Sequence, residues 1–458
     1  MTSSQALWCA AYLGSLLIVG YAIIVWLAAH RSSLEIFGLS ACMGPAVMGW
    51  WFIAWSLAGS TPSIWSVAVL TALAAISLLC KLLLRRNPKS TVKTDPTELW
   101  IKLLCMATLV AGACFIARDA IIAPTTEWDA FVAWQLKAKI LAAQPMTPRP
   151  HYFSNLNLVY SQLRYPLLVP MISAGAISAI GSDSTGLEKS PALLFYFGLA
   201  AVLFATIRRR RGTRIACLAT TFFFALPRLV ELGGTGTAEM ALIAFYGCSL
   251  DNLLAWREDG SFNALILTSL FSAAAAWTKN EGLAMAVINA SLVFFARPHI
   301  SLLRRLAATV VFSFIFSAIY VVWPLYTRGI PRVDEDYVSV LSLRGVLQNL
   351  DRIPSIIRGF LFAMANLLQW GLFWPALLVL QLLNVKLADA RSVAILWCAL
   401  FLQACAVAMV YCVATSWKVD ELMSISLDRM LLHLTPAAAI LTGLLWPENL
   451  KRTVENGQ

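Results

Sequence analysis

The chain has 458 residues, of which 59% are hydrophobic and 13% are charged. Soluble domains carry about 25% charged residues, and the apolar residues here form runs of roughly 15 to 25, the length that a membrane-spanning helix requires. The composition therefore excludes a water-soluble protein and predicts a membrane-embedded one. The net charge of +11 comes largely from basic clusters between apolar runs, such as KLLLRRNPK and RRRRGTR. Such clusters are typical of cytoplasmic loops, so nucleic acid is not expected as a partner.

Apolar segments follow one another along the whole chain. They fall near residues 5–29, 34–58, 62–84, 99–118, 163–181, 187–207, 213–230, 239–256, 262–277, 283–297, 305–325, 358–383, 392–413 and 430–446. They predict an all-α fold, a polytopic transmembrane helical bundle of about 12–14 membrane segments. Because no repeat of fixed period is found, we expect a single transmembrane domain over residues 1–458, with 1–94 as an N-terminal helical extension.

The N-terminus and the cysteines carry no special signal. The first apolar segment lacks a preceding basic region, so it is interpreted as a retained helix rather than a signal peptide. The ten cysteines lie almost wholly inside apolar segments, with neither a CxxC motif nor the spacing of metal ligands. They predict no disulfide framework and no structural metal site.

Loop charge predicts the orientation of the bundle, since basic loops stay in the cytoplasm. The basic loops are Lys81 to Lys93, Arg208 to Arg214, Arg297 to Arg305, Lys386 to Arg391 and Lys451 to Arg452, with Trp256 to Asp259 joining them by alternation. The connections expected outside are 119–162, 231–238, 278–282, 326–357 and 414–429. Three apolar segments separate the first two basic loops, although two cytoplasmic ends require an even number of crossings. We therefore predict either that segment 163–181 enters the membrane without crossing it or that one of the segment boundaries is misread.

The longest exterior loop, 119–162, contains a predicted amphipathic helix that lies in the membrane interface. Its apolar stripe comprises Trp128, Phe131, Val132, Leu136 and Ile140. Asp129 begins this helix, where a carboxylate serves either as an N-cap or as a general base. The base is favoured by the polar residues of the same stretch, which are Glu127, Lys137, Lys139, His151, Arg164 and Tyr165. Cations beside a carboxylate suit a site that binds phosphate and deprotonates a hydroxyl.

Three further polar clusters are predicted on the exterior side. A Gly-rich turn leads to Glu239 at the membrane boundary, where a carboxylate is costly without a partner. Lys279 and Glu281 interrupt a long apolar stretch. Asp428 and Arg429 stand where the last helix enters the membrane. The structural alternatives are turn dihedrals for the first cluster, a weak surface ion pair for the second and mutual neutralisation for the third.

Five short stretches among these residues carry a family resemblance. They are Glu127 to Ala130, Arg164 to Leu167, Thr237 to Glu239, Lys279 to Gly282 and Asp428 to Leu432, within roughly residues 95–446. Together they resemble the GT-C superfamily of membrane glycosyltransferases, in particular bacterial relatives of protein O-mannosyltransferases and aminoarabinose transferases. Glu239 stands where relatives commonly have Asp. Met430 and His433 replace the usual aromatic residue and proline.

The resemblance implies an inverting glycosyltransferase that moves a sugar from a polyprenyl-phosphate donor to a hydroxyl of a glycan, lipid or protein acceptor. The reaction would occur at the periplasmic face of the bacterial inner membrane, within the lipid bilayer's interface. Loop 119–162 would be catalytic, with Asp129 as the base and Glu239 holding the acceptor or sharing a divalent cation. Substrate binding would fall to Glu127, Lys137, Lys139, His151, Arg164, Tyr165, Lys279, Glu281, Asp428 and Arg429. The residues themselves demand neither a cofactor nor a metal.

Three other functions are compatible with the sequence. A lipid-substrate transporter or flippase also has intramembrane charges and broken helices, but it often has two related halves. A polysaccharide polymerase or ligase would use an oligosaccharide donor, and its large exterior loop usually comes late in the chain. In a non-catalytic assembly protein, Asp129 and Lys137 would be replaceable without loss.

Overall fold

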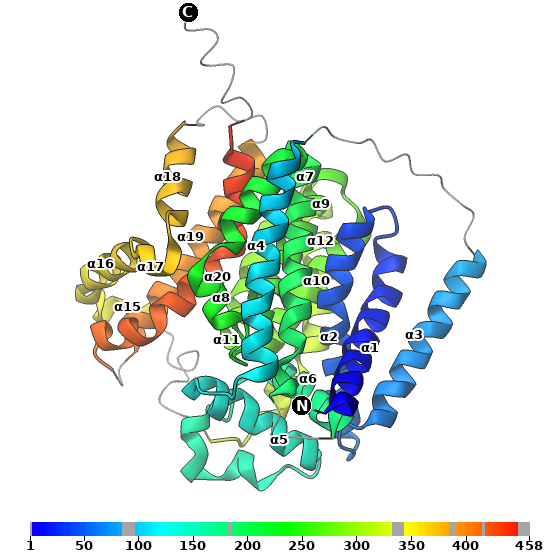
Figure 1. Cartoon of the computed structure of the whole chain (residues 1–458). Coiled ribbons are helices and arrows are strands. Elements are labelled where there is room, and N and C mark those ends of the chain that lie inside the picture. Colours follow the sequence, from blue (N-terminus) through cyan, green and yellow to red (C-terminus); the bar gives the residue numbers. More distant parts are fainter. Residues whose placement is uncertain are drawn as a thin grey trace, which may run out of the picture.

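The regular structure of the described residues is entirely helical (Figure 1). It is a computed structural model that describes residues 2–84, 97–181, 186–331, 343–383, 390–414 and 417–447. Seven of the described helices are long and apolar enough to cross a membrane. The prediction of an all-α transmembrane bundle is thereby confirmed. Most of the basic loop at 81–93, most of the loop at 386–391 and the pair at 451–452 lie outside the described residues.

The helices run through the whole chain, with irregular backbone concentrated between residues 118 and 167. The first half forms α1 (Ser3–Leu27), α2 (Ser33–Leu57), α3 (Ile64–Leu84), α4 (Leu99–Ala117), η1 (Arg118–Ile122), η2 (Ala130–Gln135), α5 (Leu136–Ala143), η3 (His151–Ser154), η4 (Leu156–Ser161), α6 (Leu168–Ile180), η5 (Leu187–Lys189) and α7 (Pro191–Phe224). The second half forms α8 (Pro227–Gly233), α9 (Glu239–Asp259), α10 (Phe262–Thr278), α11 (Asn280–Phe295), α12 (Leu302–Tyr320), α13 (Val322–Tyr326), α15 (Leu343–Gln348), η6 (Leu350–Arg352), α16 (Ile353–Met364), α17 (Leu367–Trp370), α18 (Phe373–Leu383), α19 (Ala390–Val413) and α20 (Val419–Leu445).

Helix α7 is two antiparallel limbs rather than one rod. Gly212 has φ +80° and breaks the helix there, a conformation that residues with a Cβ rarely adopt. Ile207 and Ile215 on either side of the break belong to one buried cluster. Farther along the limbs, the Tyr196 ring centroid lies 5.0 Å from that of Phe224. The predicted reversal of the chain at 208–214, between two apolar segments, is therefore present.

The described turns of the predicted cytoplasmic loops and the loop at 119–162 lie at opposite ends of the bundle (Figure 1). One end, the basic end, holds the turns near residues 28–32, 208–214, 257–261 and 297–301, tied together by contacts such as Arg31–Asp251 and Arg210–Glu258. The other end, the outer end, holds residues 118–167 and the turns at 234–238 and 279. The separation of charge that the sequence predicts is thus also a separation in space.

Helix α6 forms most of segment 163–181, one of the three apolar segments between the basic loops at 81–93 and 208–214. It has 13 residues, which at 1.5 Å per residue extend about 20 Å, shorter than the roughly 30 Å hydrocarbon core of a bilayer. It packs against α1 and α2, because a Cβ at Gly175 would lie 2.1 Å from the Phe52 ring of α2 and 2.8 Å from the Tyr12 hydroxyl of α1. A short helix enclosed by protein agrees with the prediction that segment 163–181 does not cross.

The N-terminal helices belong to the bundle. Helices α1 and α2 cross closely at Gly20 and Gly44, where a Cβ would lie 2.0 Å from the Ser40 carbonyl oxygen and 1.8 Å from the Leu16 carbonyl oxygen, respectively. Small residues at such crossings let membrane helices approach each other's backbones. Helix α2 then packs against α7 and α6. Helix α3 is mostly exposed and stands at the edge of the bundle (Figure 1).

Candidate functional site

Asp129 lies at the start of a helix in the outer end, but it does not cap that helix. Its own backbone is helical (φ −62°, ψ −39°), and its side chain makes no capping hydrogen bond. The carboxylate instead accepts a hydrogen bond from Arg429 Nη1 of α20. Because both side chains are only part-exposed, at 43% for Asp129 and 21% for Arg429, this ion pair is a specific contact between the exterior loop and the last helix.

The helix after Asp129 presents different faces from those predicted. Trp128 and Phe131 are 65% and 52% exposed, whereas Val132 is buried. The predicted stripe is therefore divided, with Val132 turned inward, and η2 is a π-helix rather than the α-helix that the periodicity assumes. The exposed pair of aromatic rings still suits a helix whose outer side meets the membrane interface.

Glu239, Lys279 and Glu281 form an ion triad that is buried at Glu239 and Lys279 and part-exposed at Glu281. Lys279 Nζ lies 3.1 Å from Glu239 Oε1 and 3.2 Å from Glu281 Oε1. The side chains of Lys279 and Glu239 are 5% and 1% exposed, so the alternative of an exposed, weak surface pair does not hold. A buried carboxylate that loses its partner is strongly destabilised, which makes Lys279 necessary for both acids.

The local backbone explains how Lys279 reaches the triad. Lys279 is extended (φ −157°, ψ 155°) and separates α10 from α11. Gly282 lets α11 turn back tightly, because a Cβ there would lie 2.0 Å from the Ala275 carbonyl oxygen. The polar interruption seen in the sequence is therefore a helix break that points an ammonium group toward the first residue of α9.

His433 joins these charges one turn after Arg429 on α20. Its side chain is buried, and neither ring nitrogen has a hydrogen-bond partner among the described residues. It interacts electrostatically with Lys279, Glu281 and Glu239. The sequence shows His433 only as a departure from a proline, so its place in the site was not predicted.

The two ion-pair groups form one site. Arg429 interacts electrostatically with Glu239 as well as with Asp129, and Lys279 in turn interacts with Arg429. We call this set the outer cluster; it consists of Asp129, Glu239, Lys279, Glu281, Arg429 and His433. Residues from the exterior loop, α9, the α10–α11 break and α20 thus meet at the outer end.

Asp428 has a different partner from the one predicted. Its carboxylate pairs with Arg228 of α8, which also lies 2.8 Å from Glu231. Arg429 contributes only its backbone N–H, 2.8 Å from Asp428 Oδ1. Mutual neutralisation of Asp428 and Arg429 is therefore wrong. Arg228 was missed because it lies within a segment interpreted as a membrane helix.

Lys137 lies apart from the outer cluster, inside the exterior loop. Its side chain is fully buried, and Nζ donates to the Gln162 carbonyl oxygen at 2.5 Å. The ammonium also lies 5.6 Å from the centroid of the Tyr165 ring. Burial lowers the pKa of Lys137 well below its usual value. This lysine therefore fastens the loop at Gln162, whose φ of +54° is unusual for a residue with a side chain.

Of the remaining residues predicted to bind substrate, some lie next to the outer cluster and others do not contact it. Tyr165 interacts electrostatically with Arg429 and packs on Trp134, with 5.7 Å between ring centroids. Arg164 is its part-buried neighbour. The other three are Glu127 and His151, which are exposed, and Lys139, which is part-exposed. No contact between these three and the outer cluster is found within the described ranges.

The outer cluster is slightly acidic. Three carboxylates (Asp129, Glu239 and Glu281) face two fixed cations (Lys279 and Arg429). The Lys279 ammonium occupies the position between Glu239 and Glu281 that a divalent cation would need. Among the residues that the structure describes, no group of three or more His, Cys, Asp or Glu side chains is arranged to hold a metal ion.

Comparisons with protein-family models, with curated proteins and with solved structures found no match to this chain. The geometry of the outer cluster is therefore the basis on which a function is proposed below.

Proposed function

We propose that the protein is an inverting glycosyltransferase that moves a sugar from a polyprenyl-phosphate donor to an acceptor hydroxyl at the outer end of the bundle. The observation that carries the proposal is the Asp129–Arg429 ion pair, part-exposed and coupled to the buried Glu239–Lys279 pair. A carboxylate and an arginine in contact, at the membrane boundary of a helical bundle, supply a proton acceptor and an anion-binding group together.

Asp129 acts as the base in this proposal. It takes the proton of the acceptor hydroxyl as that oxygen attacks the anomeric carbon and the bond from the sugar to the phosphate breaks. Its carboxylate is 43% exposed, so an acceptor can reach it. In the free protein Arg429 holds the carboxylate in place, and the same guanidinium stabilises the negative charge of the departing prenyl phosphate. Donor binding would therefore shift Arg429 from Asp129 toward the phosphate and release the base.

The ion triad supports this exchange. Lys279 is anchored between Glu239 and Glu281 and interacts with Arg429. It therefore keeps a positive charge beside the phosphate position when Arg429 moves. Glu239 interacts with both cations, so its carboxylate limits where the Arg429 side chain can settle. We assign Glu239 the orientation of the acceptor and of Arg429.

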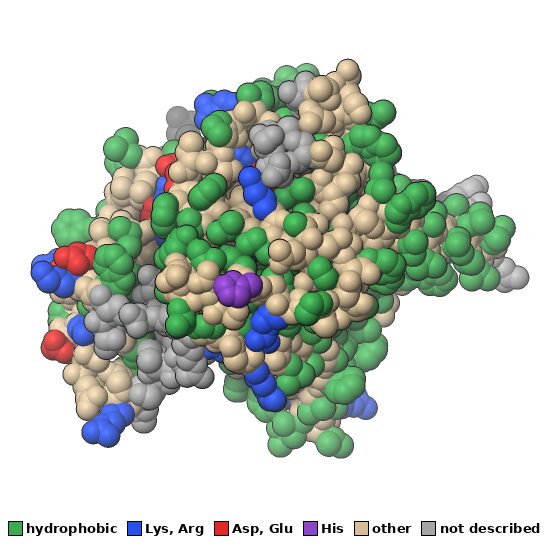
Figure 2. All heavy atoms as spheres, turned by 90° about the horizontal axis from the view of Figure 1, so that it is seen from below, with side chains coloured by type: hydrophobic (Ala, Val, Ile, Leu, Met, Phe, Trp, Pro, Cys, Tyr) green, Lys and Arg blue, Asp and Glu red, His purple; other side chains and the backbone are tan. Residues whose placement is uncertain are grey.

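A lipid donor needs an apolar surface next to the phosphate site, and α16 offers one. Ile357, Leu361 and Phe362 on one side of α16 are 55%, 64% and 73% exposed. Gly359 on the same helix faces α20, since a Cβ there would lie 2.2 Å from the Met423 side chain. Helix α16 thus packs through Gly359 on the helix that carries Arg429, and its apolar residues Ile357, Leu361 and Phe362 stay exposed. Figure 2 shows that hydrophobic side chains also spread over much of the outer end.

Transfer of a radiolabelled sugar from a polyprenyl phosphate by the purified protein in lipid nanodiscs tests the proposal. We expect Asp129→Asn to lower the rate about 10²- to 10⁴-fold, the usual contribution of a positioned base. Asp420→Asn is the matched control, because Asp420 is an exposed aspartate of α20 outside the outer cluster. Equal unfolding temperatures of the three proteins would exclude a folding defect. Full transfer by the Asp129→Asn variant would remove Asp129 as the base.

A lipid transporter is the second candidate, because a buried lysine at a helix break is also the kind of site that transporters use. Lys279 stands between α10 and α11 with its charge shared by two acids. Movement of fluorescent prenyl phosphate across proteoliposomes, without transfer of sugar, would favour this function over the first.

A further inference from the structure

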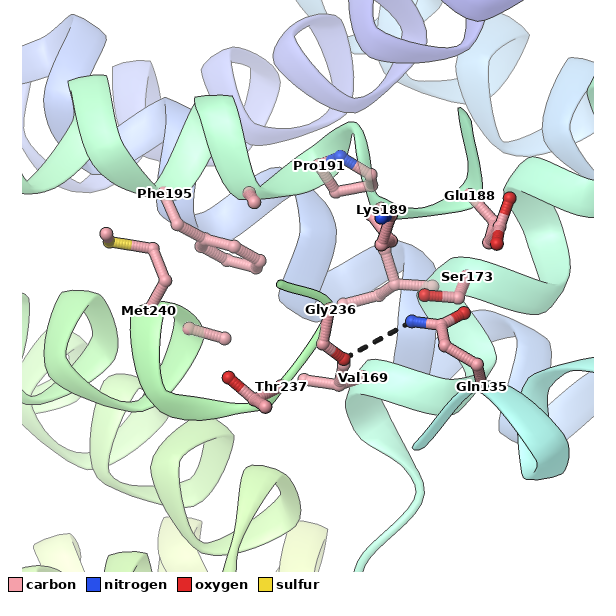
Figure 3. A pocket seen from close by; sticks show the side chains of 13 residues that line it. Gln135, Val169, Ser173, Glu188, Lys189, Pro191, Phe195, Gly236, Thr237 and Met240 are labelled. Carbon is pink, nitrogen blue, oxygen red and sulfur yellow. Dashed lines mark hydrogen bonds between the residues drawn. The ribbon is translucent and has the colours of Figure 1, made fainter. Parts of the chain in front are cut away.

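A narrow cavity lies beside the outer cluster and is lined by η2, α6, η5, α7 and the turn before α9. Figure 3 shows Gln135, Ser173, Glu188 and Lys189 on one side of this space and Phe195 on the other. The cavity measures about 30 Å³. Since a single water needs at least about 10–15 Å³, the space admits about two groups of the size of a hydroxyl.

The polar wall of the cavity is buried and has an unused acceptor. Gln135, Ser173 and Glu188 are 3%, 4% and 4% exposed. Gln135 Nε2 donates to the Gly236 carbonyl oxygen at 3.3 Å. Gln135 Oε1 has no hydrogen-bond partner among the described residues. A buried amide oxygen without a donor is unfavourable, so this oxygen marks a place where a ligand's donor group would be stabilised.

The wall is unsuited to an anion. The Lys189 ammonium already donates hydrogen bonds to the carbonyl oxygens of Asp119 at 2.6 Å and Ala123 at 2.8 Å. Glu188 adds a carboxylate beside it. The cavity therefore presents oxygen acceptors to a bound ligand. The ligand group that matches it is neutral, with O–H donors and an apolar edge.

Gly236 keeps the space between the polar side chains open. Its φ is +92°, and a Cβ there would lie 2.8 Å from Lys189 Cδ and 3.0 Å from Gln135 Nε2. The cavity is also joined to the outer cluster along two paths. Thr237, which lines it, forms a side-chain hydrogen bond with Glu239. Gln135 follows Asp129 on the same helical stretch.

We infer that this cavity is a specificity subsite that receives the hydroxyl-bearing edge of the sugar being transferred. The inference rests on the proposed function, which places the sugar at Asp129. Gln135 Oε1 and the Glu188 carboxylate accept hydrogen bonds from two sugar hydroxyls, and Phe195 contacts the apolar edge of the ring. The size of the cavity confines recognition to one edge of the sugar, while the remainder lies toward the outer cluster.

Binding of short donor analogues to the purified full-length protein tests the inference without requiring turnover. The probes are farnesyl phosphate alone and farnesyl phosphate carrying glucose, mannose, galactose or a pentose, with thermal stabilisation as the readout. We expect Gln135→Leu to weaken the best glycosylated probe about tenfold, the effect of one lost hydrogen bond to a buried group, and to leave farnesyl phosphate alone unchanged. Ser173→Ala, a smaller change in the same wall, is expected to reduce discrimination among the sugars.

Gln144→Leu is the matched control, because Gln144 follows the same helical stretch but is exposed. Equal affinity of wild type and Gln135→Leu for every glycosylated probe would overturn the inference, as would equal weakening of farnesyl phosphate alone. The proposed function fails separately. If no donor is turned over but sugar-dependent binding remains sensitive to Gln135→Leu, the subsite stands and the transfer reaction does not.

Discussion

Burial decides which of the charged residues can act on a substrate. Asp129 and Arg429 are part-exposed and in contact, so they can exchange partners with a ligand. Lys137 is fully buried against a carbonyl oxygen, so its role is to hold the exterior loop. The two residues are eight positions apart on one helical stretch, and their different environments follow from the direction in which each side chain points.

Lys137 makes the loop's stability depend on pH. Its folded pKa is lowered by burial, so between that pKa and the unfolded value near 10.4 the unfolded chain binds more protons. Stability then rises with pH across this window and is lowest below the folded pKa. We expect the unfolding temperature of Lys137→Met, relative to wild type, to fall as pH is raised from about 7 to 10. A temperature difference that is constant with pH would contradict a titrating, buried Lys137; Lys139→Met, altering a part-exposed neighbour, is the control.

The sequence predicts which residues belong to the outer cluster better than it predicts which of them form ion pairs with each other. Asp129, Glu239, Lys279 and Arg429 were all predicted on the exterior side, and the structure brings them together. The contact between Asp129 and Arg429 joins residues 300 positions apart, and no local pattern encodes such a contact. The burial of Lys137 was missed because helical periodicity assumes α geometry, whereas η2 is a π-helix.

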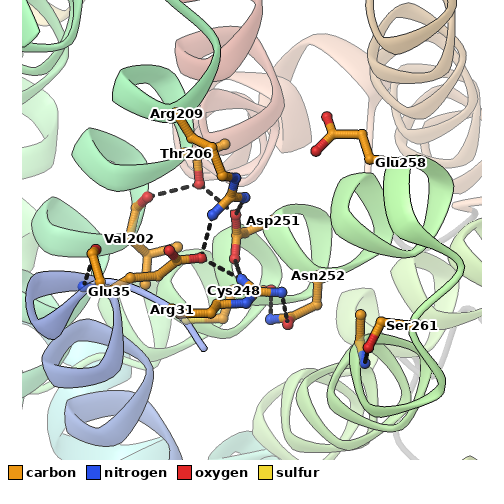
Figure 4. Close-up of polar contacts among 12 residues, drawn as sticks. Arg31, Glu35, Val202, Thr206, Arg209, Cys248, Asp251, Asn252, Glu258 and Ser261 are labelled. Atoms are coloured by element: carbon orange, nitrogen blue, oxygen red, sulfur yellow. Dashed lines mark hydrogen bonds and ion pairs between the residues drawn. The ribbon is translucent and has the colours of Figure 1, made fainter. Parts of the chain in front are cut away.

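At the scale of the helices, the basic end is held by a second ion network. Arg31 and Arg209 both contact the carboxylates of Glu35 and Asp251 (Figure 4). Arg209 Nη2 lies 2.7 Å from Asp251 Oδ1, and Thr206 Oγ1 donates to the same oxygen at 2.7 Å. Because Arg31 and Glu35 come from the start of the chain, this network fastens α1 and α2 to α7 and α9.

Asp251→Asn should destabilise the protein strongly. The Asp251 side chain is fully buried, and its loss of charge leaves two arginines to one carboxylate. Breaking a buried ion pair costs about 3–5 kcal/mol, measurable as a lower resistance to unfolding in mixed micelles. Asp259→Asn at the exposed end of the same helix should change nothing measurable. Equal stability of the two variants would show that the network does not fasten the helices.

The sequence does not reveal this network. Arg209 belongs to a run of four arginines that loop charge alone explains. Asp251 lies in the middle of a segment whose apolar residues predict a membrane helix. The basic run and the apolar segment are both present in the structure as predicted. The Arg209–Asp251 ion pair, however, arises from the packing of α7 against α9, a tertiary contact that periodicity does not encode.

The whole molecule separates two kinds of charge along one axis. The described basic turns at 208–214, 257–261 and 297–301 lie at one end and the outer cluster at the other (Figure 1). This arrangement could be predicted from the sequence. Successive membrane helices cross in opposite directions, and the basic turns identify the cytoplasmic side of the membrane. The parity of crossings also predicts that one apolar segment does not cross, and the 13 residues of α6 suit that segment.

Labelling of single cysteines tests the proposed orientation, in which the outer end faces the periplasm of a bacterial cell. Ser154 and Ser301 are exposed at the outer end and the basic end, respectively; the exposed native cysteines Cys80, Cys114 and Cys398 would be replaced by serine. We expect a membrane-impermeant maleimide to label Ser154→Cys in intact spheroplasts and Ser301→Cys only after permeabilisation. The reverse pattern would place the outer cluster in the cytoplasm and rule out a periplasmic reaction.

The contribution of Arg429 from the last helix has a consequence for biosynthesis. A nascent chain that has inserted only as far as α19 carries Asp129, Glu239 and Glu281 at the outer end, with Lys279 as their one partner from the outer cluster. Asp129 therefore gains its guanidinium partner only after α20 has inserted. A chain that stops before α20 would keep the Glu239–Lys279–Glu281 triad but leave Asp129 without Arg429. The order of synthesis thus makes assembly of the exterior loop site depend on a helix made long after that loop.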